Sequence, residues 1–150
     1  MYERFYPTMD WAEHRHAWPH AAQSHFVNAG GIRWHVQRMG QGPALLLLHG
    51  TGSGSFSWRG LMPLLSQHFQ VIAPDLPGHA FTSRGGEDGL SLHGMAEGLR
   101  ALLLQMDITP TVVAGHSAGA AIAAHMVLHQ GALAQTHLIG MNPAWLPIPG

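Results

Sequence analysis

The sequence predicts an α/β protein with a mostly parallel β-sheet and helices on both faces. Short apolar runs such as Ala44–Leu48 recur along the chain, and segments with the spacing of amphipathic helices separate them. Runs without polar alternation indicate strands buried on both faces, which is typical of parallel sheets covered by helices. One such run leads through a glycine-rich turn into a helix, as strand-to-helix connections do in this class.

The composition indicates a single globular domain without strong charge bias. The 150 residues are 46% hydrophobic and 10% charged, the formal net charge is -1, and the basic residues do not cluster, so no nucleic-acid partner is expected. The absence of cysteine excludes disulfides, thiolate metal sites and a cysteine nucleophile. No apolar run approaches ~18 residues, and the first seven residues carry charge and proline, so we expect a cytoplasmic protein with no export signal and no membrane span.

Residues 1–24 are expected to form an irregular N-terminal segment, and residues 25–150 the domain itself. The segment has tryptophans and prolines but no sustained period, and its tryptophans indicate that it is docked. Four histidines lie in or next to it without the carboxylate or thiolate support of a metal site: His14, His16, His20 and His25. We expect a solvated, aromatic-rich surface there, and no metal and no cofactor.

An antiparallel hairpin is predicted from His25 onward. Apolar and polar residues alternate strictly over positions 32–37, and Gly30-Gly31 supplies a tight turn. This pattern predicts two half-buried strands. The continuously apolar run 44–48 is then expected to be a central, fully buried strand.

A glycine-rich loop, His49-Gly50-Thr51-Gly52-Ser53-Gly54, follows the 44–48 strand. Glycines there allow backbone N–H groups to face an anion or a developing oxyanion. A Walker-type phosphate loop needs a lysine followed by serine or threonine, and this loop has no lysine, so nucleotide binding is not expected. An amphipathic segment over about 57–67 comes next, and its predicted inward residues are Trp58, Leu61, Leu64 and Leu65.

The next buried strand, 69–73, leads to Asp75, which precedes a Pro-Gly turn. An aspartate at such a position accepts hydrogen bonds from nearby backbone N–H groups, so we favour a structural role for Asp75 over a catalytic one. Ser91 is the expected N-cap of a later helix. The predicted inward face of that helix comprises Leu92, Met95, Ala96, Leu99, Leu102, Leu103 and Met106.

A strand, a sharp turn and a helix surround Ser117. The apolar run 112–114 precedes Gly115-His116-Ser117-Ala118-Gly119, and an alanine-rich helical pattern follows to about position 130. In so tight a turn the missing Cβ of Gly115 and Gly119 permits close backbone approach. The G-x-S-x-G spacing in this context favours a nucleophilic role for Ser117 over an ordinary turn of small residues. A last buried strand is expected over 136–141.

Four stretches of this sequence match the pattern of a known family. They are the hairpin, His49-Gly50-Thr51-Gly52, Asp75-Leu76-Pro77-Gly78-His79 and the Gly115–Gly119 motif. In order and spacing they resemble the α/β-hydrolase superfamily over roughly residues 25–142. The resemblance implies the N-terminal part of the α/β-hydrolase fold, with Ser117 as catalytic nucleophile and the backbone N–H groups of Thr51 and Ala118 as oxyanion hole. It also implies supporting positions in the elbow and loops, namely His49, Gly50, Gly115, His116, Gly119 and Asp75.

The sequence departs from the superfamily pattern in two places. Ala80 stands where a glycine is usual, which indicates an altered turn. In this fold the triad acid and histidine follow the serine, yet after Ser117 there is no Asp or Glu, and no histidine that is placed to act as base. The histidines after Ser117 are His125 and His129 on the following helix and His137 on the last strand, and His116 before it lies within the elbow and is not expected to be the base. We therefore expect a fragment that lacks the final strands and cap, with its last strand an exposed edge open to intermolecular pairing.

A narrower resemblance involves Trp18-Pro19-His20, the segment 24–37 and both loops. These stretches look like those of the magnesium-chelatase accessory proteins of bacteriochlorophyll biosynthesis. This resemblance implies a role in photosynthetic pigment synthesis, with a tetrapyrrole-related ligand and magnesium-chelatase subunits as partners.

Three hypotheses for function therefore stay open. The complete protein is a serine hydrolase acting on a small-molecule ester or related acyl bond, in pigment synthesis or unrelated to it. Alternatively it is a non-enzymatic accessory protein. The third hypothesis is a catalytically incomplete, truncated binding protein, because the 150 residues lack the triad acid and base.

Overall fold

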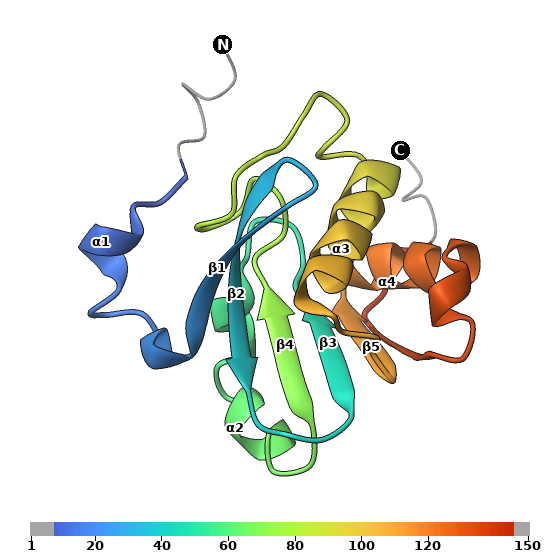
Figure 1. Ribbon diagram of the computed structural model, residues 1–150, viewed down its shortest axis with the longest axis horizontal. Helices are drawn as coiled ribbons and strands as arrows, with labels where there is room; N and C mark the ends of the chain where they lie inside the picture. Colours follow the sequence, from blue (N-terminus) through green and yellow to red (C-terminus); the bar gives the residue numbers. More distant parts are fainter. Residues whose placement is uncertain (1–7, 146–150) are drawn as a thin grey trace.

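The structure is a computed structural model that describes residues 8–145. These residues are organised around a six-stranded sheet (Figure 1). The strand order is β1-β2-β4-β3-β5-β6, with β3 to β6 parallel and the β1–β2 hairpin antiparallel. The strands are β1 Ser24–Ala29, β2 Ile32–Met39, β3 Ala44–Leu48, β4 Gln70–Pro74, β5 Val112–His116 and β6 His137–Met141. The predicted mostly parallel sheet with an antiparallel N-terminal hairpin is confirmed.

Helices cover both faces of the sheet, as predicted. Helices α3 Leu92–Met106 and α4 Ala118–His129 lie side by side on one face (Figure 1), where the core includes Leu46, Ile72 and Val113. The short helices η3 Ser55–Trp58 and α2 Met62–Leu65 cover the other face, against Leu45, Leu47 and Val71. Successive side chains of a strand point to opposite faces, so each apolar run feeds both cores. Three further short helices are α1 Trp11–His14, η2 Ala21–Gln23 and η4 Gly131–Leu133.

The β1–β2 hairpin turns at Gly30 and Gly31, as the sequence predicts. Their φ angles of 59° and 75° are both positive, and Ala29 pairs directly with Ile32, which is the geometry of a two-residue type I′ turn. The prediction that β2 is buried on one face only is wrong, however. His35 and Gln37 have no exposed surface, because a second layer covers their face of the strand.

That second layer is the described part of the N-terminal segment, residues 8–23. The Trp11 ring lies 5.1 Å from the His35 ring, and the Gln37 side-chain amide donates to the Pro19 carbonyl at 2.7 Å. Trp18 packs edge-on against Phe81. The expectation that the tryptophans are docked is therefore confirmed, although the segment contains two short helices rather than wholly irregular chain.

The predicted inward face of the 57–67 segment is partly wrong. Leu61 and Leu64 are 45% and 61% exposed, whereas Met62 is fully buried. Residues 59–61, which include Gly60, separate η3 from α2, and Pro63 lies in the first turn of α2. This break changes which residues face the sheet.

Two burial predictions further along the chain need correction. Ser91 caps α3 as expected, since its Oγ accepts from the Gly94 N–H at 2.9 Å, but Leu92 in the first turn is 46% exposed. Strand β6 forms at the predicted place and is not buried, with Ile139 49% exposed. Among the described residues β6 pairs only with β5, so one edge has no neighbour.

None of the helices between residues 8 and 145 has the length and hydropathy needed to cross a bilayer.

Candidate functional site

Ser117 occupies a strained turn between β5 and α4. Its backbone angles, φ 55° and ψ -119°, lie outside the regions that residues other than glycine ordinarily adopt. The Ser117 N–H donates to the Met141 carbonyl of β6 at 3.0 Å, which fixes the turn to the neighbouring strand. The strain is therefore held in place by the sheet, and it presents a half-buried serine at the carboxyl end of β5.

Gly115 and Gly119 allow the tight packing of this turn. A Cβ on Gly115 would overlap the Gly119 carbonyl group, and a Cβ on Gly119 would overlap the backbone carbonyl groups of Leu48 and His49 at the end of β3. The alanine-rich helix α4 thus begins directly above β3 and β5. Larger residues at either glycine position would push the helix away from the sheet.

The glycine-rich loop after β3 lies beside Ser117. A Cβ built on Gly50 would lie 3.3 Å from the Ser117 Cβ, so the two backbones are close neighbours. Thr51 is exposed at this rim, and Ala118 is the first residue of α4, where an N–H has no acceptor within the helix. Within residues 8–145 neither the Thr51 nor the Ala118 N–H donates a hydrogen bond, so both are available to a ligand.

His49 ties this loop to the end of β4. Its Nδ1 bonds the Gly50 carbonyl at 2.7 Å, and its Nε2 accepts from the Leu76 N–H at 2.8 Å. Because a backbone N–H can only donate, Nε2 is the unprotonated nitrogen and Nδ1 carries the hydrogen. Burial is the main cause that lowers the pKa of His49 from 6.5 to about 4. The ring is neutral at pH 7 and acts as a fixed brace between the two loops.

Asp75 performs the structural role expected of it. The carboxylate accepts from the backbone N–H groups of Ser55 at 2.7 Å and Phe81 at 3.2 Å, and also from the His35 Nδ1 at 2.7 Å. Burial raises its pKa, but these hydrogen bonds and the nearby His35 ring outweigh burial and hold the pKa of Asp75 below 3.8. A buried carboxylate therefore fixes the residue that directly follows the glycine-rich loop.

A hydrogen-bonded chain that the sequence analysis did not predict runs from the half-buried Ser24 through the buried His35 to the buried Asp75. The Ser24 Oγ lies 2.8 Å from the His35 Nε2, which gives the connectivity of a serine–histidine–aspartate triad. His35 and Asp75 have no exposed surface, and the rings of Trp11, Phe26 and Phe81 surround His35. This chain joins β1, β2 and the loop after β4. The polar side chains at positions 35 and 37 of an otherwise buried strand were the only hint in the sequence.

No histidine in the described part of the chain hydrogen-bonds the Ser117 hydroxyl. His137 lies at the amino end of β6, opposite Val112 and thus at the other edge of the sheet. His125 and His129 lie on α4, where His125 faces His93 of α3, with 3.5 Å between ring nitrogens. His116 is exposed and adjoins Gly50. The described residues thus bring a candidate nucleophile to two free N–H groups without a general base.

The described residues also contain no group of three histidine, cysteine, aspartate or glutamate side chains arranged to hold a metal ion.

Comparisons with known proteins agree with this fold. A family model described as the alpha/beta hydrolase fold matches residues 43–143. The magnesium-chelatase 30 kDa subunit of Rhodobacter capsulatus is 39% identical over 129 residues, which cover 85% of this chain and 44% of that protein. The pimeloyl-acyl-carrier-protein methyl ester esterase of Aeromonas hydrophila is 33% identical, with 74% of this chain and 42% of the esterase covered.

Solved structures show the same similarity. A candidate lipase of Acinetobacter baumannii AYE superposes with a TM-score of 0.70 and 31% identity, with 76% of this chain and 38% of the lipase covered. The chain therefore spans less than half the length of these proteins.

Proposed function

The chain belongs to the α/β-hydrolase fold family, and from that premise we propose that it carries the nucleophile and the oxyanion-binding loop of a serine hydrolase. The observation that carries the proposal is the backbone of Ser117. A serine at a φ of 55° between a parallel strand and a helix lies at the carboxyl end of the strand, which is the edge where ligands bind in open α/β folds.

In this proposal the Ser117 hydroxyl adds to the carbonyl carbon of an ester or related acyl bond and gives its proton to a base. The resulting oxyanion accepts hydrogen bonds from the Thr51 and Ala118 N–H groups. Loss of one such donor typically removes roughly 3 to 4 kcal/mol of transition-state stabilisation. When the bond is an ester, the tetrahedral adduct breaks its bond to the leaving oxygen, which takes the proton from the protonated base and departs as the alcohol. The base then takes a proton from water, which adds to the acyl carbon, and the proton returns to the Ser117 oxygen as the acid leaves. The base and its acid come from the remainder of a longer protein, since the relatives extend well beyond the matched region.

His49 and Asp75 support this chemistry without touching the reacting atoms. The loop that holds Thr51 is braced at its start by His49 and at its end by Asp75, through the Ser55 N–H. Two rigid braces reduce the reorganisation that the loop would need when the oxyanion forms. We therefore assign both as positioning residues for the oxyanion loop.

A serine-reactive fluorophosphonate probe tests the proposal on the full-length protein. We expect labelling that is lost in Ser117→Ala and retained in Ser24→Ala, the matched control that removes a different histidine-bonded serine. Labelling that persists in Ser117→Ala, or no labelling of the folded protein at all, would contradict a nucleophilic role for Ser117.

A second candidate function is an accessory role for magnesium chelatase. The observation that favours it is the 39% identity to the Rhodobacter capsulatus subunit over 129 residues, which is 85% of this chain. In that role the region around Ser117 holds a tetrapyrrole-related ligand or contacts chelatase subunits.

The rate of magnesium insertion by the chelatase, with and without the full-length protein, tests this second role. An increase that survives Ser117→Ala supports an accessory function independent of acyl chemistry. A rate increase that is lost in Ser117→Ala would indicate that the accessory role depends on the acyl chemistry. An unchanged rate, with no chelatase subunit that co-purifies, counts against the accessory role.

A further inference from the structure

Three histidines gather on the solvent side of the α3–α4 helix pair and form what we call the histidine cluster. His93 lies in the first turn of α3, and His125 and His129 lie on α4, where a spacing of four residues places them on one face. The His125 ring centroid is 5.7 Å from that of His93 and 4.6 Å from that of His129. His93 and His129 are exposed and His125 is half-buried. The proposed acyl chemistry uses none of them.

The spacing of the rings matches that of imidazoles bound to one metal ion. The His93 Nδ1 lies 3.5 Å from the His125 Nε2, which is longer than the roughly 3.2 Å upper limit of ordinary hydrogen bonds from N–H groups. Two nitrogens bound to a tetrahedral zinc ion are about 3.4 Å apart, and their ring centroids are about 5 Å apart. The two nitrogens therefore bond each other poorly, yet they have the separation that a shared ion imposes.

The charges around the histidine cluster suit a cation. Burial, followed by the His129 and His93 rings, lowers the pKa of His125 below its usual 6.5. The ring is therefore neutral at pH 7, which is the form of histidine that binds metals. Glu97, one turn after His93 on α3, acts on the pKa of His125 in the opposite direction. Its carboxylate accepts a bond from the Arg100 Nε at 3.0 Å, so Glu97 is a charged neighbour of the cluster and not one of its ligands.

A change of rotamer at the exposed rings brings the three histidines to one point. Within residues 8–145 no three metal-binding side chains surround a common point as they stand. Exposed side chains such as those of His93 and His129 change rotamer on a nanosecond timescale or faster. Two histidines four residues apart on one helix face are also a known zinc-binding arrangement.

We propose that His93, His125 and His129 bind a divalent transition-metal ion of the Zn²⁺ class, with water as the fourth ligand. Imidazole nitrogen is a preferred ligand of Zn²⁺, Cu²⁺ and Ni²⁺, whereas Mg²⁺ and Ca²⁺ prefer oxygen ligands. The ion links α3 to α4. His125 is about 12 Å along the helix axis from Ser117, so this site is separate from the acyl chemistry.

Titration of the untagged, ¹⁵N-labelled full-length protein with ZnCl₂ near pH 7 tests the proposal. We expect saturable shifts of the backbone amides next to the three histidines. The variants His93→Asn, His125→Asn and His129→Asn should each weaken Zn²⁺ binding by about tenfold or more, because each removes one ligand. Mg²⁺ should cause no such shifts. Zn²⁺ affinity should also fall as the pH is lowered, because protons compete for the imidazole nitrogens.

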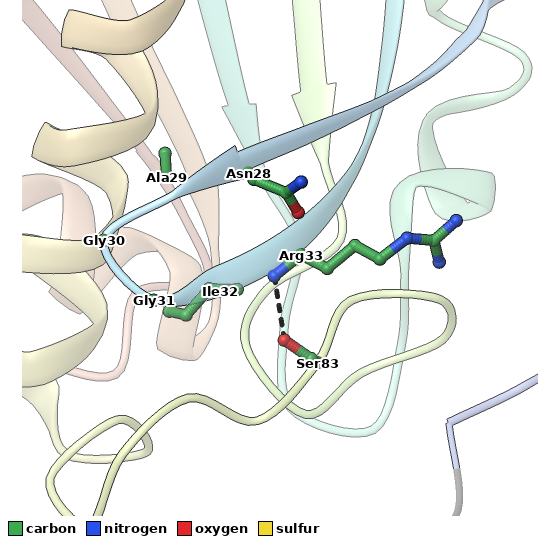
Figure 2. A pocket seen from close by; sticks show the side chains of 7 residues that line it. All are labelled: Asn28, Ala29, Gly30, Gly31, Ile32, Arg33 and Ser83. Carbon is green, nitrogen blue, oxygen red and sulfur yellow. Dashed lines mark hydrogen bonds between the residues drawn. The ribbon is translucent and has the colours of Figure 1, made fainter.

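Two controls distinguish the histidine cluster from general binding to surface histidines. His137→Asn removes an exposed histidine at the amino end of β6 and should leave Zn²⁺ affinity unchanged. Gly30 and Gly31 provide reference amides at the hairpin turn, because Gly30 lies against Ala101 of α3. The residues around this turn, drawn in Figure 2, include no histidine or carboxylate, so the two signals should not shift.

Two results would overturn the proposal. One is unchanged Zn²⁺ affinity in any of the three cluster variants, since the residue concerned would then not be a ligand. In the case of His93→Asn, this result would confine binding to α4. The other is a loss of affinity in His137→Asn as large as in His125→Asn, which would indicate non-specific binding to exposed histidines.

Discussion

Ser117 shows how one residue sets the geometry of the candidate site. Its positive φ is sterically unfavourable for a serine, and the bond from its N–H to Met141 and the two flanking glycines hold it there. Glycine is needed at positions 115 and 119 for another reason. Gly115 and Gly119 have ordinary φ angles, but the neighbouring backbone leaves no space for a Cβ.

Gly119→Ala should destabilise the fold because the new methyl group would meet the rigid backbone carbonyls of Leu48 and His49. We expect the free energy of unfolding to fall by at least about 2 kcal/mol, as for overpacked core positions. Urea unfolding measures the change. Gly60→Ala is the control, since a Cβ there meets nothing within 4 Å, and it should change stability by less than about 0.5 kcal/mol. A Gly119→Ala variant as stable as this control would contradict the packing argument.

The buried His49 ring predicts a loss of stability between pH 6.5 and about pH 4. Over this range the unfolded chain protonates His49 while the folded protein keeps it neutral, so the free energy of unfolding falls as the pH falls. The loss attributable to His49 is up to about 3 kcal/mol. His49→Asn should flatten the slope of unfolding free energy between pH 7 and 4.5, while the exposed control His137→Asn should leave it unchanged. An NMR titration of His49 near pH 6.5 would disprove the prediction.

At the scale of elements, Asp75 ties the segment after the glycine-rich loop to the paired strands β2 and β4. Its carboxylate bonds the residue after the glycine-rich loop, the loop after β4 and the centre of β2. Because the pKa of Asp75 is held below 3.8, its contribution to stability is complete above that pH and is lost as the pH falls further. The acid sensitivity of Asp75 thus begins where that of His49 ends.

Asp75→Ala should cost about 3 to 5 kcal/mol, because it leaves His35 and two backbone N–H groups unpaired in the interior. The comparison is Glu97→Ala, which breaks the Glu97–Arg100 ion pair on α3. Both partners of that pair are more than 40% exposed, so this change should lie within about 0.5 kcal/mol. Urea unfolding of the two variants at pH 7 gives the comparison, and similar losses in both would refute the role assigned to Asp75.

At the scale of the whole molecule, β6 leaves one edge of the sheet unpaired among the described residues. The edge carries the half-exposed Ile139, and Trp145 beyond it is 52% exposed. An exposed apolar strand edge favours pairing with another chain. The 150-residue chain expressed alone is therefore expected to self-associate in a concentration-dependent manner.

Ile139→Lys should raise the monomer fraction of this chain in size-exclusion chromatography with light scattering, since a charge at a strand edge opposes pairing. Leu104→Lys, on the 67% exposed leucine of α3, tests whether any exposed apolar residue has the same effect. Equal improvement by both variants would indicate general apolar association and would count against edge pairing through β6.

The sequence by itself determined the α/β sheet with its hairpin, the turn at Gly30-Gly31, the Ser91 cap and the strand–turn–helix around Ser117. These features depend on local spacing, glycine positions and capping, which can be recognised within a window of about ten residues. Only the tertiary structure decided that His35 is buried against Asp75, 40 positions away, that Met62 rather than Leu61 faces the core, and that β6 is exposed. Burial and long-range hydrogen bonds depend on which distant segment covers a face, and periodicity along one segment carries no information about that partner.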